Sequence, residues 1–326
     1  MMNTAQPEGR ARFAGRRIAS LTKYAGNPIL APGGADWRTH ALYNPTAWTD
    51  DETVFLLYRA EGPSDIPGRP FTSRIGLATS RDGIHFEHHP APILSPGEPY
   101  ELPGGCEDPR LVQIDGTFYL TYTAYDGAVA RLCLASSPDL LHWHKHGPMF
   151  ADEQWDAYFP RQQFPNTPRA WSKSGAIVPI KIGGRYWMYF GDTHIWAASS
   201  PDLRAWQIDP APVVSPRANA FDAGLVEPGP APLVVNDTIW LGYNSADQRL
   251  RYAFGQVVLD LEQPTRTLYR SETPLLQPES RDEIEGQVPQ VVFVEGMVFF
   301  QGRWLLYYGM ADSRLGLATA EWVGEF

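Results

Sequence analysis

The feature that most constrains the fold is an internal repeat of about 60 residues, a period typical of folds built from repeated structural units. A proline followed by two apolar residues recurs five times along the chain. The prolines are Pro28, Pro92, Pro148, Pro212 and Pro274, which lie 64, 56, 64 and 62 residues apart. Five copies in phase are hard to obtain by chance, so the chain is expected to contain five similar units.

Two further elements recur in phase with these prolines. Runs similar to Arg-Leu-Gly-Leu-Ala-Thr occupy residues 74–80, 131–137, 194–200 and 314–320. Aromatic or β-branched runs occupy residues 54–58, 118–122, 186–190, 239–243 and 304–308. Each unit therefore predicts four short strands bounded by turn residues. Four-stranded units repeated around an axis are the blades of a β-propeller, so we expect an all-β, five-bladed β-propeller, with a β-sandwich as the alternative.

The ends of the chain predict how such a ring closes. The first proline element precedes the first complete unit, and the last unit ends without one. A strand near the N-terminus can thus complete the fifth blade, which removes two exposed sheet edges. We expect residues 1–22 to form an N-terminal extension and residues 23–326 to form a single propeller domain.

Composition excludes several other classes of protein. With 30 Pro and 29 Gly, a bundle of long helices is disfavoured, while 43% apolar and 13% aromatic residues disfavour disorder. The net charge of −10 without basic clusters argues against a nucleic-acid partner, and no apolar run is long enough to span a membrane. The N-terminus does not resemble a secretory signal, and only two cysteines occur. We therefore expect a cytoplasmic protein with reduced thiols.

Polar residues occupy the positions at which the inner strands of such units would line a central channel. Converging charges are costly unless a ligand or mutual pairing compensates them, so either a polar-ligand pocket or a paired polar network is predicted. The mixture of acids, amides and aromatic residues favours a sugar as the ligand. The candidate substrate-binding residues are Asn44, Arg59, Arg110, Tyr125, Lys173, Asp192, His194, Asn244 and Asp312.

Two carboxylates of this set stand on different predicted blades. An inverting glycosidase uses one carboxylic acid at the leaving oxygen and a second carboxylate that activates water, about 6.5–9.5 Å away. Asp108 and Glu227 are predicted to face the same axis, which makes such a separation attainable. Glu107 precedes Asp108 in the strand and is expected to point to the opposite face.

Several segments carry a resemblance to a known family. The run Gly-Gly-Cys-Glu-Asp-Pro-Arg at residues 104–110, together with the segments 43–45, 58–60, 229–232 and 291–293, resembles glycoside hydrolase family 130. The resemblance extends over residues 23–320. It implies a five-bladed propeller that acts on β-mannosides with inversion, as a phosphorylase or as a hydrolase.

The resemblance also implies residue roles. The family's acid matches Asp108, which would protonate the leaving oxygen through the 3-hydroxyl of mannose. Positions similar to the family's mannose-binding residues are Asn44, Arg59 and Asp312. No metal or other cofactor is expected, and a manno-oligosaccharide is the expected partner, with a homo-oligomer left open.

A phosphorylase needs fixed cations to hold a phosphate dianion. Where the family's phosphorylases carry basic residues, this chain has Tyr-Phe-Gly-Asp at 189–192, Leu-Val-Glu-Pro at 225–228 and Tyr-Asn-Ser at 243–245. We therefore expect an inverting hydrolase of β-mannosides, with β-1,2-linked manno-oligosaccharides as substrates. Glu227 is the first candidate for the general base and Glu295 is the second.

Two alternatives to the hydrolase remain. One is a phosphorylase in which Lys173 and arginines of the long segment 152–172 hold phosphate. The other is a sugar-binding propeller without catalysis.

Overall fold

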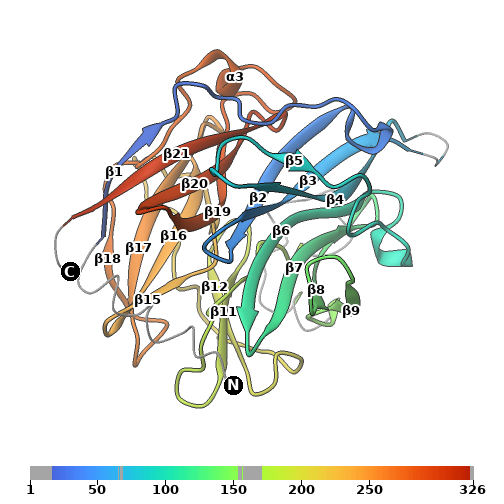
Figure 1. Cartoon of the computed structure of the whole chain (residues 1–326). Helices are drawn as coiled ribbons and strands as arrows, with labels where there is room; N and C mark the ends of the chain where they lie inside the picture. The colour runs from blue at the N-terminus through green and yellow to red at the C-terminus, as the bar shows by residue number, and fades with distance from the viewer. Residues whose placement is uncertain (1–16, 65, 67–68, 153–155, 157–170, 324–326) are drawn as a thin grey trace.

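The computed structural model describes residues 17–64, 66, 69–152, 156 and 171–323 (Figure 1). Nearly all regular structure in this part of the chain is β-strand, which confirms the expected all-β class. The short helical segments described are η1 (Asp36–Arg38), η2 (Pro99–Glu101) and α3 (Arg281–Ile284). None of the helices in the described part is long and apolar enough to cross a membrane.

The strands form antiparallel groups in which neighbours along the chain are neighbours in the sheet. The first two groups are β2 (Ala41–Thr49), β3 (Val54–Pro63), β4 (Phe71–Ser80) and β5 (Glu87–His88), then β6 (Gly105–Ile114), β7 (Thr117–Tyr125), β8 (Ala130–Ser137) and β9 (His144–Pro148). A single parallel bridge between Ser73 and Gly105 joins these two groups into one sheet.

Three further sheets follow the same pattern. They contain β10 (Ala176–Ile177), β11 (Tyr186–Phe190), β12 (Trp196–Ser200) and β13 (Gln207–Ile208), then β14 (Leu225–Pro228), β15 (Leu233–Val235), β16 (Thr238–Ala246), β17 (Tyr252–Asp260) and β18 (Thr267–Arg270), and finally β19 (Val292–Phe300), β20 (Arg303–Met310) and β21 (Arg314–Val323) with β1 (Arg17–Lys23).

The repeated proline element has the same structural role in different groups. Its second apolar residue forms a β-bridge with a residue in the third strand or directly before it, as in Leu94 with Ile75. The equivalent bridges join Val214 to Ile195, Leu276 to Phe254 and Leu30 to Leu315. The sequence repeat is therefore also a structural repeat.

The N-terminal strand pairs with the C-terminal one. β1 lies antiparallel to β21, with Leu21 opposite Ala320, and Figure 1 shows the two strands side by side. This strand begins at Arg17, within the range 1–22 that the sequence assigned to an N-terminal extension. The sheet includes residues that the sequence assigned to the extension.

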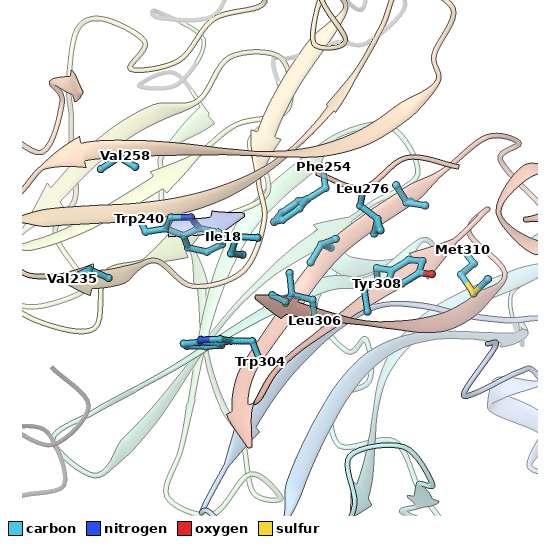
Figure 2. Close-up of a cluster of buried hydrophobic side chains, with 14 residues drawn as sticks. Ile18, Val235, Trp240, Phe254, Val258, Leu276, Trp304, Leu306, Tyr308 and Met310 are labelled. Atoms are coloured by element: carbon cyan, nitrogen blue, oxygen red, sulfur yellow. The ribbon is translucent and has the colours of Figure 1, made fainter. Parts of the chain in front are cut away.

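Burial of Ile18 explains why the strand starts so early. Its side chain is fully buried in a cluster that joins β1 to the neighbouring strands, beside Trp240 and near Leu306 (Figure 2). Burying an aliphatic side chain as large as that of isoleucine stabilises a fold by about 1.5–3 kcal/mol.

Candidate active site

Three first strands of the repeat contain a β-bulge, and each bulge carries a candidate residue. The pairing register shifts at Asn44 in β2, at Asp108 in β6 and at Glu295 in β19. Asn44 and Asp108 both have a φ of 50°, a left-handed conformation that Asn and Asp adopt more readily than most residues. A bulge redirects side chains and is common beside active sites.

Asp108 lies at the centre of a polar cluster. Its Oδ1 accepts a hydrogen bond of 2.9 Å from Asn44 Nδ2 and one of 3.2 Å from Arg59, and its Oδ2 lies 4.0 Å from Lys173 Nζ. Burial raises the pKa of Asp108, but Arg59 and Lys173 outweigh it and the pKa is lowered overall. The carboxylate is therefore ionised in the free site.

Arg59 joins Asp108 to two glutamates. Its guanidinium lies 2.9 Å from Glu61 and 2.9 Å from Glu107, and it stacks over the ring of Tyr43 at 4.6 Å. The expectation that Glu107 points away from Asp108 is wrong, because the bulge interrupts the alternation of side chains and both carboxylates reach the same guanidinium.

Glu227 approaches this cluster from β14. Its Oε2 lies 3.7 Å from Lys173 Nζ and accepts a hydrogen bond of 3.2 Å from Ser174 Oγ. Burial raises its pKa to about 7, against the opposing effect of Lys173. The same ammonium touches both carboxylates, so the Asp108 and Glu227 oxygens lie at most about 7.7 Å apart, the sum of the two distances. This limit leaves room for the roughly 6.5–9.5 Å that inverting glycosidases use.

Two further acids lie within electrostatic reach. Burial raises the pKa of Asp312 to about 7, while Arg59 opposes the shift. Burial also raises the pKa of Asp192, and Lys173 opposes it. These predicted residues therefore share their environment with Asp108 and Glu227.

Glu295 lies beneath this cluster. Its side chain is fully buried, and Oε1 lies 2.8 Å from the Nη2 of Arg110, which is itself 1% exposed. Neither oxygen of Glu295 has a hydrogen bond of good geometry within the described structure. Burial raises its pKa well above the usual value, with Arg110 opposing. Of the two candidate bases, Glu227 is the one in contact with Lys173, whereas Glu295 is enclosed by the protein.

Three predicted sugar-binding residues are not bonded to Asp108 or Glu227, although Asn244 stands opposite Glu227 in the pairing of β14 with β16. Asn244 is fully buried and uses both amide atoms on Val294, donating to its oxygen at 2.9 Å and accepting from its nitrogen at 2.8 Å. Tyr125 packs against Trp171, and His194 is half-buried. Within the described structure, no hydrogen bond or ion pair joins these three side chains to Asp108 or Glu227.

Several residues that complete the cluster are not among the candidate substrate-binding residues. Tyr43 donates a hydrogen bond of 2.6 Å to Glu61, and Gln287 donates one of 3.1 Å to the other oxygen of that carboxylate. Burial and Glu227 raise the pKa of Tyr252, which places this tyrosine near the same centre. Its position at the start of a third strand was the only signal available. Most of the segment 152–172 lies outside the described residues.

Comparisons with known proteins identify the family. The family model described as β-1,4-mannooligosaccharide phosphorylase, that of glycoside hydrolase family 130, matches residues 18–323. A 1,2-β-oligomannan phosphorylase of Thermoanaerobacter sp. (strain X514) is 35% identical over 311 residues, which cover 93% of this chain and 98% of that protein. The chain belongs to glycoside hydrolase family 130, as its motifs indicated.

Two solved structures show the same fold. A β-1,2-mannobiose phosphorylase from Listeria innocua, in complex with β-1,2-mannobiose, has a TM-score of 0.78 at 25% identity and covers 92% of this chain and 96% of its own. Another structure has a TM-score of 0.82 at 33% identity, covering 93% and 94%. That structure comes from work on family 130, which reports that this family of mannoside phosphorylases contains glycoside hydrolases that target β-1,2 mannosidic linkages in Candida mannan.

Proposed function

We propose that this protein is an inverting hydrolase of β-mannosides that acts on β-1,2-linked manno-oligosaccharides. In this proposal Asp108 is the general acid and Glu227 is the general base. The observation that carries it is the charge balance around Lys173, which lies between two carboxylates. Relatives that act on β-1,2-linked mannosides support the substrate class.

The charge balance disfavours phosphate. Arg59 is paired with three carboxylates, and Lys173 contacts Asp108 and Glu227. Arg110 is enclosed, donates to backbone carbonyls and forms an ion pair with Glu295. Each of these cations in the described site is thus already compensated. A phosphate dianion would have to displace one of these carboxylates, whereas a water molecule would not.

The proposed reaction needs one proton on the carboxylate pair. Asp108 donates it to the leaving oxygen, by way of the mannose 3-hydroxyl, while ionised Glu227 removes a proton from the attacking water. In the free site Glu227 has the higher pKa of the two. When the pair carries one proton, that proton is therefore mostly on Glu227, and the reactive form with the proton on Asp108 is the less populated one. The two groups titrate as a pair.

Phosphorolysis is the second candidate, because the curated relative at 35% identity is a phosphorylase. In that case Lys173 and residues of the segment 152–172 hold phosphate. A sugar-binding propeller without catalysis is the remaining alternative.

We also propose that the strand groups form a five-bladed β-propeller closed by β1. The order of the sheets and the pairing of β1 with β21 support this arrangement. It would direct the bulged strands toward one axis.

The test is to incubate the protein with β-1,2-mannobiose with and without phosphate and to analyse the products. The proposal expects mannose at the same rate in both, with the α-anomer released first when the reaction is followed by NMR. Mannose 1-phosphate as the main product would overturn hydrolysis. Binding of mannobiose without turnover, in both the unmodified protein and Asp108→Asn, would instead support a sugar-binding protein.

A further inference from the structure

Arg110 connects the strand that carries Asp108 to the strand that carries Glu227. Its Nη2 donates to Pro228 O at 2.7 Å and its Nε donates to Gly229 O at 3.0 Å, directly after Glu227. Its Nη1 lies 3.4 Å from the backbone oxygen of Asp108. The two strands belong to different sheets, so one guanidinium spans the gap between them.

Glu295 is the carboxyl partner of that guanidinium. It stands at the bulge of β19, so its side chain is turned away from the regular alternation of the strand. The 2.8 Å contact with Nη2 is an ion pair without the geometry of a hydrogen bond. Glu295 thus contacts Arg110 while the guanidinium N–H groups donate to the carbonyls of Pro228 and Gly229.

The surroundings fix Glu295 in turn. The Asn244 side chain forms hydrogen bonds with both the backbone nitrogen and the backbone oxygen of Val294. At Gly229, the residue after β14, an added Cβ would meet Val294 O and Gly242 O at 2.9 Å, so the end of β14 lies close against the backbone of β19. Strands from three sheets therefore meet around one buried ion pair.

We propose that Glu295 is a positioning residue: through Arg110 it sets the position of Glu227 relative to Asp108. This inference rests on the proposed function and assigns Glu295 a different role from that of the general base. Breaking a buried ion pair leaves an uncompensated charge, and Arg110 would then move toward other acids. A displacement of about 1 Å between reacting groups can lower the rate by about 10²-fold.

The test compares Glu295→Gln with Glu283→Gln. Glu283 is equally buried and pairs with Lys23 at 2.8 Å, but it lies on α3, so it controls for the loss of a buried carboxylate. The inference expects Glu295→Gln to lower kcat for β-1,2-mannobiose by about 10²-fold with KM unchanged, and Glu283→Gln to leave both unchanged. Equal kcat in the two variants, once both are shown to be folded, would overturn it.

Azide separates a positioning residue from a base. Azide needs no deprotonation, so it should restore turnover to Glu227→Ala with formation of mannosyl azide, and it should not do so for Glu295→Ala. Mannosyl azide from Glu295→Ala would make Glu295 the base and overturn the inference.

If the unmodified protein neither hydrolyses nor phosphorolyses mannobiose, the proposed function fails. A crystal structure of Glu295→Gln then still tests the positioning role. Loss of the Arg110 bonds to Pro228 and Gly229, with a changed separation of Asp108 and Glu227, would support the positioning role. Unchanged bonds and an unchanged separation would refute it.

Discussion

Replacing Lys173 by methionine removes a positive charge that lies 4.0 Å from Asp108 and 3.7 Å from Glu227. At this range, with an effective dielectric constant of about 20, a unit charge contributes about 4 kcal/mol. One pKa unit corresponds to about 1.4 kcal/mol, so the upper limit for Glu227 is a shift of about three units. The Lys173 side chain is 22% exposed, and solvent screening reduces this to about one to two units.

The direction of the shift follows from the sign of the charge. Lys173 favours the ionised form of Glu227, so its removal raises the pKa of Glu227 above about 7. The reactive form has one proton on the carboxylate pair, and it is lost at high pH when this last proton leaves. The alkaline limb of kcat/KM should therefore begin near pH 7 in the unmodified protein and move up by at least about one pH unit in Lys173→Met.

The assay measures kcat/KM for β-1,2-mannobiose between about pH 4 and pH 10, the range that brackets the two expected limbs. Lys145→Met is the matched control, because Lys145 is 19% exposed and lies 2.6 Å from the buried Glu101, outside the site. The control should keep the original pH profile. An alkaline limb that stays in place or moves down in Lys173→Met would refute the electrostatic reasoning, and a selective loss of mannose 1-phosphate would identify Lys173 as a phosphate ligand.

Three other variants test separate parts of the structure. Asp108→Asn should lower kcat by about 10²–10⁴-fold while mannobiose binding, measured by calorimetry, persists; retained turnover would exclude Asp108 as the acid. Arg59→Ala leaves three carboxylates without their partner and should cost about 3–5 kcal/mol in denaturant unfolding; an unchanged midpoint would contradict this. Ile18→Ala should cost about 2–4 kcal/mol in the same experiment, whereas Leu250→Ala, at a residue that is 59% exposed, should change stability by less than about 0.5 kcal/mol.

The sequence predicted the strand groups well because the signal is periodic. Proline and apolar residues recur at positions that all units share, and the bridges of Leu94 and Val214 repeat the same contact. The convergence of Arg59, Lys173 and Asp108 is what the proposed propeller predicts, because equivalent positions of its blades would share an axis. The start of β1 could not be predicted, because a single edge strand has no repeat to mark its boundary.

The fate of individual polar side chains was harder to predict. A bulge adds one residue to a strand, and nothing in the local alternation around Glu107 shows that it is present. Asn244 was selected because it stands at the end of a predicted second strand, and Glu295 because the family's phosphorylases tend to have an uncharged residue at that position. Whether the protein itself uses their polar atoms depends on Val294 and Arg110, which come from other sheets.

The pairing of β1 with β21 also affects how the chain is made. The two strands lie far apart in the sequence, at Arg17–Lys23 and Arg314–Val323, so β1 emerges from the ribosome long before its partner. At roughly 5–20 residues per second, β1 waits about 15–60 s for that partner. Until then the cluster that buries Ile18 lacks its residues on β21, and β1 has no partner strand in the sheet. This sheet is therefore complete only once β21 has been made, and a chain that stops before residue 314 cannot form the pairing.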